Sequence, residues 1–549
     1  MFKKYTSLAL IMGALYIAPC WAEADDSALL LSASLDSLST ACSATVAADL
    51  SAQSVAQLQE FYQRLDYTPL WQDAARRQQL IELILDTRYD GLNPAQYPLP
   101  QALSLEQATW PQQQACDEIL YSHSYLKALR HLRDGVLVQA QVEPYWYEAE
   151  VQPAVPQPIA EVAATGVNDL SDTFAKVRPQ HSAYQKLREV LKSSYLLTQP
   201  DWGQVPSQGR SMRVGEQDRR IPRLRERLQI AGYLPQQQDE VVLLDTSVDE
   251  HTELSTPVNP LRYDEALLEA VKTFQQDHYL EEDGIVGPAT LRELNISPAQ
   301  RLLQVRANLE RLRWLDKLME PDMLVVDIAG ARLLYFSGGD IVWRTRTQVG
   351  TVRRQTPLLK SRITHLTINP TWTVPPTILR EDKLPEIRRD ISYLTRSNMS
   401  VLDYQGNRLD PYSIDWRAPT GIMLRQGPGP SNALGLVAIR FANPFTVYLH
   451  DTPSKHIFGR ATRTVSSGCV RVEDAQKLVD LLLLTATDEE RERIARIQAS
   501  GKTRNVNLPQ PVPVLLAYWT VEVDMDNRLR FRSDSYARDM NIIEALMSL

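Results

Sequence analysis

The spacing of hydrophobic residues changes twice along the chain and so divides it into three regions. In the first, from about residue 27 to 200, apolar positions recur at helical spacing in stretches such as AQLQEFYQRLDYTPLW and ILYSHSYLKALRHLRDG. This period predicts amphipathic helices, and the segment YDGLNPAQYPLP between the two stretches predicts a turn. We therefore expect a helical domain in this part of the chain.

A second helical region begins near Gly215. In GEQDRRIPRLRERLQIAGYL the apolar residues share one helical face, and Gly232 ends the helix. After an acidic insertion, from about residue 236 to 262, the pattern resumes in YDEALLEAVKTFQQDHYLEEDGIVGPATLREL, where Asp264 is the expected N-cap. The sequence predicts a compact helical module over residues 215–297.

The third region, from about Met323, has the pattern of β-strands. MLVVDI and RLLYF, followed by SGGD and IVWRTRTQVG, predict a strand and a hairpin, and LTINPTWTVPPTIL and FTVYLH are expected to continue the sheet. Between them, residues 379–416 are charged and too long for a hairpin loop. We call this segment the lid, because insertions of this size beside a β-scaffold often cover a site. Helical spacing of four apolar residues favours an ordered lid over a disordered linker: Leu384, Ile387, Ile391 and Leu394.

Length and composition agree with several folded domains. The chain has 549 residues, of which 44% are hydrophobic and 23% charged, and one hydrophobic core does not usually grow that large. Together with the two kinds of periodicity, this predicts a multidomain α+β protein. The net charge of −8 argues against nucleic-acid binding through a generally basic surface.

The N-terminus has the features of a secretory signal peptide, residues 1–22. Two lysines precede an apolar run from residue 8 to 18, which is shorter than the roughly 20 residues of a membrane-spanning helix. We expect cleavage after Ala22 and export of the protein. A lipoprotein signal ending at Cys20 is the less favoured alternative, because a proline precedes that cysteine.

Removal of the signal leaves three cysteines. In an oxidising compartment two of them are expected to pair, and Cys42 and Cys116 lie in the same region of the chain. The alternative is three separate buried thiols. In either case Cys469 is left unpaired.

Cys469 lies in the stretch YLHDTPSKHIFGRATRTVSSGCVRVE, which also contains His450 at the end of an apolar strand run. An amphipathic helix, EDAQKLVDLLLL, is predicted to follow the cysteine, and a helix N-terminus would stabilise its thiolate. The amides of Gly468 and Cys469 could donate to an oxyanion. These features suggest a nucleophile and a base, with a buried structural sulfur as the alternative.

This stretch resembles the active-site motif of the YkuD-type L,D-transpeptidases. In that motif a histidine precedes Ser/Thr-His-Gly-Cys; here His450 is followed, after fifteen residues, by Ser-Ser-Gly-Cys and then Arg471. The phrases VGTVRRQTP, NPTWTVPP, RQGPGPSNALG and HDTP are similar to the large YcbB-like subgroup. AVKTFQQ and DGIVGPATL resemble the small peptidoglycan-binding domain of wall enzymes.

The domain order of that subgroup implies boundaries for this chain. A helical scaffold domain would span residues 23–210 and a peptidoglycan-binding-like domain residues 215–297. A mostly-β catalytic domain would span residues 300–525 and contain the lid, and residues 526–549 would form a C-terminal tail. The long insertion in the second domain departs from the family's short loop.

The resemblance also implies roles for individual residues. Cys469 would be the nucleophile and His450 the general base, with the carbonyl of Asp451 orienting the imidazole. Ser467 stands where most members have a second histidine, and with Gly468 it would position the oxyanion. Three further residues are candidates for substrate binding, with core packing or a surface ion pair as an equal alternative: Tyr448, Trp372 and Arg471.

The implied reaction is acyl transfer between peptidoglycan stem peptides. The cysteine would attack the diaminopimelate carbonyl of a tetrapeptide stem, release D-alanine, and pass the acyl group to the diaminopimelate amine of a neighbouring stem, without a metal or other cofactor. The resemblance further implies a Gram-negative periplasmic enzyme that carbapenems modify covalently and that works with other wall synthases. An L,D-carboxypeptidase that uses water as acceptor and a non-catalytic wall-binding scaffold are the alternatives.

Overall fold

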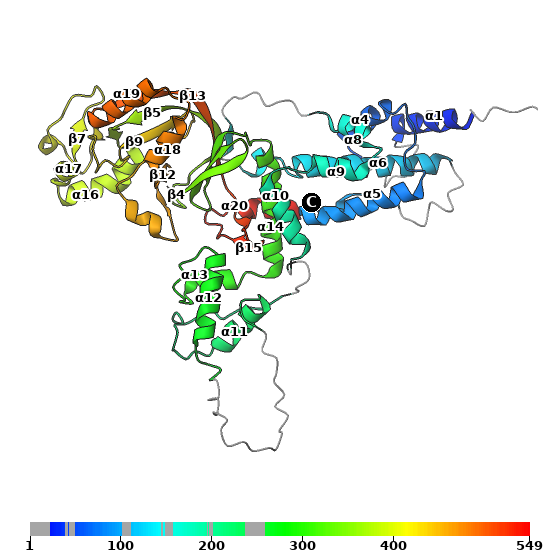
Figure 1. The fold of residues 1–549 in the computed structure, drawn as a ribbon, viewed down its shortest axis with the longest axis horizontal. Helices are drawn as coiled ribbons and strands as arrows, with labels where there is room; N and C mark the ends of the chain where they lie inside the picture. The colour runs from blue at the N-terminus through cyan, green and yellow to red at the C-terminus, as the bar shows by residue number, and fades with distance from the viewer. Residues whose placement is uncertain are drawn as a thin grey trace, which may run out of the picture. The chain divides into compact units, whose positions relative to one another are not determined.

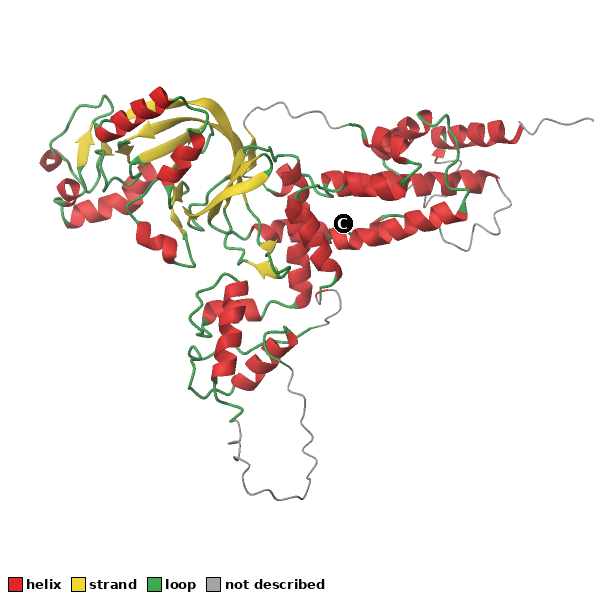
Figure 2. Cartoon of the chain, in the orientation of Figure 1, coloured by secondary structure: helices red, strands yellow, loops and turns green. Residues whose placement is uncertain are grey.

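The computed structural model describes residues 22–38, 42, 50–100, 111–143, 146–148, 157–194, 196, 201–235 and 259–549 (Figure 1, Figure 2). The expected signal peptide apart from Ala22, and most of the expected insertion, lie outside these residues. The chain forms two compact units. The first comprises Met1–Arg88, Leu92–Arg133 and Val155–Arg178, and the second Tyr89–Gly91, Asp134–Ala154 and Pro179–Leu549.

The first unit is helical, as the apolar periodicity predicts. Ser51 caps one of its helices by accepting a hydrogen bond from the Ser54 amide, and Asp73 caps the next by accepting from the Ala75 amide. A disulfide joins Cys42 to Cys116, which is the pairing expected from the cysteine count. The main helices of this unit are α1 (Ala22–Asp36), α4 (Ala52–Gln63), α5 (Ala74–Asp86), α6 (Pro111–Asp134), α8 (Ile159–Gly166) and α9 (Leu170–Val177).

The core of the first unit is rich in aromatic rings, including Phe61, Tyr125 and Phe174. Glu118 is also buried there, and its carboxylate accepts hydrogen bonds from the Leu70 and Trp71 amides. A buried carboxylate is tolerated when such donors replace water. This unit therefore has a complete core of its own.

The second unit contains the predicted helical module. Asp264 caps its second helix by accepting from the Leu267 amide at 2.9 Å, and Pro288 is the first residue of the third helix, where a proline fits. The three helices are α11 (Ile221–Ile230), α12 (Glu265–Asp277) and α13 (Pro288–Leu294). Their apolar faces enclose a small core that includes Leu224, Val271 and Phe274.

Two segments near the expected domain boundaries pack within the second unit. Residues 179–210, expected in the scaffold domain, belong to the second unit, where α10 (Ser182–Lys192) packs beside α14 (Pro298–Asp316). Residues 526–549, expected to be a tail, form β15 (Leu529–Phe531) and α20 (Arg538–Met547). Helix α20 is integral because its apolar face, with Ile542 and Leu546, is buried against α14.

The main sheet of the second unit has the strand order β1-β5-β13-β2-β3-β4-β12-β10-β9, with β11 paired to β4. Because β9 also pairs with β5, the path of strands closes on itself. The expected strand and hairpin are β2, β3 and β4. The strands are β1 (Trp146–Glu148), β2 (Met323–Asp327), β3 (Arg332–Ser337), β4 (Asp340–Gly350), β5 (Leu358–Ile368), β9 (Val437–Phe441), β10 (Leu449–His450), β11 (Thr464–Ser466), β12 (Val470–Val472) and β13 (Arg504–Ala517).

Helices α18 (Ala475–Leu482) and α19 (Asp488–Ala499) cover the core of this sheet, as Figure 1 shows. Leu478 and Ile494 contribute their apolar side chains to that core. A further hairpin pairs β14 (Val521–Val523) with β15. The stretch that contains His450 and Cys469 contributes β10, β11 and β12 to the main sheet.

The lid belongs to a second, smaller sheet of order β6-β8-β7. The helical spacing expected in the lid appears as two short helices, which are separated at Asp390, where the backbone is extended. NPTWTVPP, which was expected to continue the main sheet, pairs with β8 in the smaller sheet instead. Apolar side chains of the lid, among them Ile387 and Leu394, form a separate core together with Trp372 of NPTWTVPP. The elements are β6 (Trp372–Thr373), α15 (Pro376–Ile378), the π-helical turn η4 (Leu379–Lys383), α16 (Leu384–Arg389), α17 (Tyr393–Arg396), β7 (Met399–Leu402) and β8 (Met423–Gln426).

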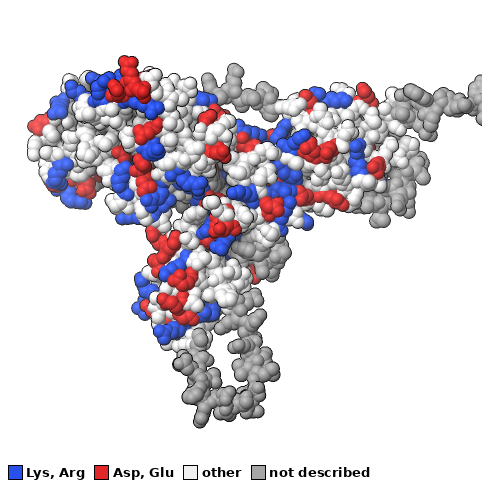
Figure 3. Space-filling model, in the orientation of Figure 1, with Lys and Arg blue, Asp and Glu red and all other residues white. Residues whose placement is uncertain are grey.

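The surface carries charges of both signs. On the face that Figure 3 shows, basic and acidic side chains are interspersed over the described residues. This face therefore lacks the single-signed field that attracts nucleic acid. Within the described ranges, no helix combines the length and the apolar character needed to cross a bilayer.

Candidate active site

The backbone brings His450 and Cys469 onto neighbouring strands. β10 runs parallel to β12, with Leu449 opposite Val470 and His450 opposite Arg471, and the Val470 amide donates to the Tyr448 carbonyl at 3.1 Å. Cys469 directly precedes β12 and so lies opposite Tyr448. Since side chains alternate along a strand, Tyr448, His450, Cys469 and Arg471 project from the same face of the sheet.

His450 is buried, with 4% of its surface exposed, and its orientation is fixed. Its Nδ1 lies 2.5 Å from the carbonyl oxygen of Asp451, which can only accept, so Nδ1 carries the proton and Nε2 is left as an acceptor. Burial, together with the charge of Arg471, lowers the pKa of His450 to about 3. The imidazole is therefore neutral at physiological pH and able to take a proton.

Cys469 is a free thiol whose side chain is partly exposed. Burial raises its pKa, while the charges of Arg440 and Arg471 act in the opposite direction. The expected helix forms as α18, but it begins only at Ala475, because Val470–Val472 pairs as β12 with β10 and β4 and lies between the cysteine and the helix. The helix therefore does not stabilise the thiolate, and the resting pair consists of a thiol and a neutral imidazole.

The turn before Cys469 is held by hydrogen bonds. Gly468 has φ +111°, a conformation that glycine adopts readily, and its amide donates to Ser466 Oγ at 3.2 Å. Ser466 Oγ donates in turn to the Cys469 carbonyl, and Thr356 Oγ1 donates to the Gly468 carbonyl. The Gly468 amide is therefore engaged, which leaves the Cys469 amide as the better placed of the two expected oxyanion donors.

Ser467 is exposed and accepts a hydrogen bond from the Arg354 guanidinium at 2.8 Å. Arg354 also pairs with two carboxylates of the lid, Glu381 and Asp382. The sequence analysis did not single out Arg354. The only signal was its place in the phrase VGTVRRQTP, which identifies neither its neighbours nor its role.

The three candidates for substrate binding differ in their surroundings. Tyr448 packs against both the main core and the lid core, and the Arg440 guanidinium lies 3.8 Å from its ring centroid. Trp372 is 9% exposed and belongs to the lid core, which favours packing over substrate contact. Arg471 donates to Gln348 Oε1 at 3.1 Å and, within the described residues, has no acidic side chain as ion-pair partner.

Other histidines and metal ligands do not complete the site. His456 lies on the exposed turn η6 (Lys455–Gly459), where its side chain faces solvent. In the part of the chain that the structure describes, no three His, Cys, Asp or Glu side chains are grouped as metal ligands would be. The chemistry that the arrangement supports is nucleophilic attack by a thiol with a neutral histidine as base.

Family models match three segments of the chain. Residues 56–191 match a scaffold domain, residues 217–294 a "Putative peptidoglycan binding domain", and residues 321–499 the L,D-transpeptidase catalytic domain. The chain thus carries the three domains of the family that its motifs resemble, with His450 and Cys469 inside the catalytic one. These matches confirm the expected multidomain α+β architecture.

A curated relative is also described as an L,D-transpeptidase. A protein of Haemophilus influenzae named "Putative L,D-transpeptidase" is 36% identical over 262 residues, which are 46% of this chain and 51% of that relative. The chain therefore spans about half the length of the curated relative that it matches.

Solved structures of L,D-transpeptidases were also matched. The enzyme from Mycobacterium smegmatis is 14% identical, over 36% of this chain and 58% of that one, with a TM-score of 0.16. Residues 123–326 of the enzyme from Xylanimonas cellulosilytica are 15% identical, over 57% of this chain and 100% of that one, with a TM-score of 0.15. TM-scores this low carry no structural argument.

Proposed function

We propose that the protein is an L,D-transpeptidase that cross-links peptidoglycan stem peptides through a thioester on Cys469. The observation that carries this proposal is the parallel pairing of β10 with β12, which places His450 and Cys469 on one face of the sheet inside the segment matched by the L,D-transpeptidase model. The neutral imidazole, with its proton on Nδ1, supports the role of base.

The first half-reaction forms the thioester. As the Cys469 sulfur attacks the diaminopimelate carbonyl of a tetrapeptide stem, its proton passes to Nε2 of His450. The Cys469 amide donates to the oxyanion of the tetrahedral intermediate. When the C–N bond breaks, D-alanine leaves and takes the proton from the imidazolium. Because the thiol and the imidazole both start neutral, the proton moves during the attack rather than before it.

The second half-reaction reverses these roles. A diaminopimelate amine of a neighbouring stem attacks the thioester carbonyl and gives a proton to His450. Collapse of the intermediate breaks the C–S bond, and the leaving sulfur regains a proton. The products are a cross-link and the starting enzyme. Water in place of the amine would give an L,D-carboxypeptidase.

The setting of the reaction is also a proposal. The N-terminal signal supports export to the periplasm, and the peptidoglycan-binding module supports the wall as substrate. Carbapenems would acylate the same thiol, since they present a strained carbonyl to it. Other wall synthases would supply the stems that the enzyme joins.

Product analysis tests this function. Purified disaccharide-tetrapeptide is incubated with the full chain, and the products are separated and weighed by liquid chromatography with mass spectrometry. We expect a cross-linked dimer and one D-alanine for each bond, and neither with Cys469→Ala. Tripeptide without dimer would identify the carboxypeptidase instead. Unchanged tetrapeptide would contradict both and favour a non-catalytic wall-binding role.

A further inference from the structure

The Arg354 side chain makes four hydrogen bonds that join the lid to the catalytic motif. One terminal nitrogen donates to Asp382 Oδ2 at 2.7 Å and to Ser467 Oγ at 2.8 Å. The other donates to Asp382 Oδ1 at 2.9 Å and to Glu381 Oε2 at 2.7 Å. Two carboxylates of the lid therefore share one guanidinium, which is hydrogen-bonded to the residue two places before Cys469.

On the side of the catalytic motif, Arg354 is held by the backbone. It lies in the turn after β4, where its amide donates to the Thr351 carbonyl. The Thr351 amide donates in turn to the Ser466 carbonyl, and β11 pairs with β4 next to this point. The guanidinium is thus fixed at the edge of the turn that carries Gly468 and Cys469.

On the other side, the two carboxylates lie on the short turn η4. This turn is anchored by Lys383, whose ammonium donates to the Tyr393 hydroxyl and lies 5.6 Å from the Trp372 ring centroid. The paired side chains remain partly open to solvent, with 21% of Arg354, 29% of Glu381 and 41% of Asp382 exposed. Ion pairs this accessible can exchange partners.

We propose that Arg354 is a carboxylate-binding subsite for the acyl-donor stem, and that Glu381 and Asp382 fill this subsite in the free protein. A planar guanidinium matches the two oxygens of a carboxylate, and a tetrapeptide stem brings free carboxylates to the atoms next to the scissile bond. Entry of the stem replaces the lid carboxylates on Arg354. The inference rests on the proposed function, since it takes the stem peptide as ligand.

Substitution of Arg354 and substitution of the two lid carboxylates should have opposite effects on binding of the donor stem. Arg354→Ala removes the subsite, so the donor stem loses a charge-assisted pair of hydrogen bonds. The double substitution Glu381→Gln and Asp382→Asn removes the internal competitors and leaves the subsite free. A purely structural tie between lid and motif would instead make both variants bind the stem worse.

The matched control is Arg353→Ala. Arg353 lies in the same turn and carries the same charge, but its side chain is exposed. Among the described residues, no ion pair or hydrogen bond joins it to the lid; the pKa of Glu381 is lowered first by the hydrogen bond from Arg354 and to a smaller extent by the charge of Arg353. Its removal changes the local net charge as much as Arg354→Ala does, so a difference between the two variants reports the specific contacts.

Binding is measured in the full chain with Cys469→Ala as background, so that no turnover is needed. Calorimetric titration with purified disaccharide-tetrapeptide should show roughly ten-fold weaker binding for Arg354→Ala, because two charge-assisted hydrogen bonds are lost. The double variant should bind severalfold more tightly, and Arg353→Ala should bind as the background does. A stem with amidated carboxylates should bind equally with and without Arg354.

The outcome separates this inference from the proposed function. Unchanged binding in Arg354→Ala, weaker binding in the double variant, or no binding of the stem to the background protein would overturn the subsite. If the expected binding pattern appears while the wild-type protein makes no product from the same stem, the subsite stands and the proposed function fails. Because the double variant leaves Arg354 and its turn intact, the test does not depend on the folding of Arg354→Ala.

Discussion

At the scale of single residues, the candidate site consists of a buried neutral histidine and a thiol on the same face of the sheet. The Asp451 carbonyl fixes the tautomer of His450, and burial keeps the ring neutral. Burial also keeps the Cys469 proton in place. Both groups are therefore uncharged at rest, and in the proposed mechanism His450 takes up a proton only when the substrate carbonyl is attacked.

The first prediction concerns the ionisation of Cys469. Because burial raises the pKa of this thiol, its alkylation by iodoacetamide should be slow at pH 7 and should rise with a midpoint above the ordinary value of about 8.5. The rate is measured from pH 5 to 10, with the unfolded protein as control at the ordinary midpoint. A rate already at its plateau by pH 7 would indicate a preformed thiolate and contradict the neutral pair.

The second prediction concerns His450. His450→Gln should lower the rate of acylation by about 100-fold or more, the usual effect of losing a positioned base. His456→Gln should leave the rate unchanged, because that side chain is exposed on η6. The rate of the wild-type protein should not fall through protonation of His450 between pH 7 and 5, since its pKa is about 3. Stopped-flow acylation by a carbapenem measures all three, and equal losses in the two variants would refute the assignment.

Sequence reasoning identified His450 and Cys469 because their motif is compact and chemically specific. It missed Arg354 and Arg440 because their neighbours come from other segments. The partners of Arg354 lie 27 and 28 residues away, and Arg440 contacts Tyr448 from a different strand. Nothing in the local sequence records such pairs.

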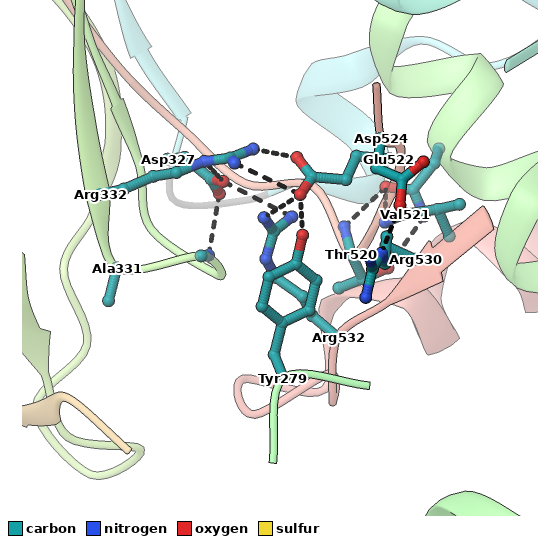
Figure 4. Close-up of polar contacts among 12 residues, drawn as sticks. Tyr279, Asp327, Ala331, Arg332, Thr520, Val521, Glu522, Asp524, Arg530 and Arg532 are labelled. Atoms are coloured by element: carbon teal, nitrogen blue, oxygen red, sulfur yellow. Dashed lines mark hydrogen bonds and ion pairs between the residues drawn. The ribbon is translucent and has the colours of Figure 1, made fainter. Parts of the chain in front are cut away.

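At the scale of elements, a polar junction joins the peptidoglycan-binding module to the β14–β15 hairpin (Figure 4). Glu522 on β14 accepts hydrogen bonds from Arg332, Arg532 and Tyr279, and the Arg532 guanidinium also lies 4.3 Å from the Tyr279 ring centroid. Although burial acts to raise it, the pKa of Glu522 is lowered to about 2 by these arginines. The carboxylate is thus ionised and holds the two guanidinium groups together.

The third prediction tests this junction. Glu522→Gln leaves Asp327 as the remaining carboxylate beside Arg332 and Arg532, and it should destabilise the protein by about 3 kcal/mol, the scale for breaking a buried pair. Asp526→Asn on the exposed turn of the same hairpin is the control and should change little. Urea unfolding at pH 7.5 measures both. The contribution of Glu522 to the free energy of unfolding should disappear as the pH falls from about 4.3 towards 2, because the pKa of Glu522 is lower in the folded than in the unfolded protein. Equal stability of the two variants at pH 7.5 would contradict the account.

The fourth prediction concerns the disulfide of the first unit. It spans 74 residues, so its reduction should cost roughly 2–4 kcal/mol through the greater freedom of the unfolded chain. Thiol counting on denatured protein should find one free thiol before reduction and three after it. Thermal unfolding with and without reductant measures the loss. Three free thiols in exported protein would disprove the pairing in the native molecule.

Element predictions failed where tertiary pairing decides the outcome. The helix expected over EDAQKLVDLLLL is present as α18, but Val470–Val472 forms a strand between β10 and β4 and separates this helix from Cys469. NPTWTVPP was expected to continue the main sheet, but Trp372–Thr373 pairs with β8 in the smaller sheet, whereas the helical spacing of the lid was predicted correctly and appears in α16 and α17. Caps such as Asp264 were predicted correctly because they depend only on near neighbours.

At the scale of the whole molecule, changes in hydrophobic period separated the helical regions from the β-region, and the family models match a segment in each. The sequence did not reveal that β1, from residues 146–148, joins the catalytic sheet beside β5. The paired strands are some 200 residues apart and β1 has only three residues, so no local sequence pattern predicts that they pair. The length and composition of the chain predict several domains, but they do not predict that a short segment such as residues 146–148 joins a sheet formed by a distant part of the chain.

The central claim is that Cys469 carries the acyl group, and intact-protein mass spectrometry tests it most directly. The wild-type protein and Cys469→Ala are each incubated with purified disaccharide-tetrapeptide, quenched in acid and weighed, and the modified peptide is sequenced. The account predicts that wild type gains the mass of the stem less D-alanine, on the peptide containing Cys469, and that Cys469→Ala gains nothing. The same adduct on Cys469→Ala, or cross-linked product from wild type with the label on another residue, would contradict it.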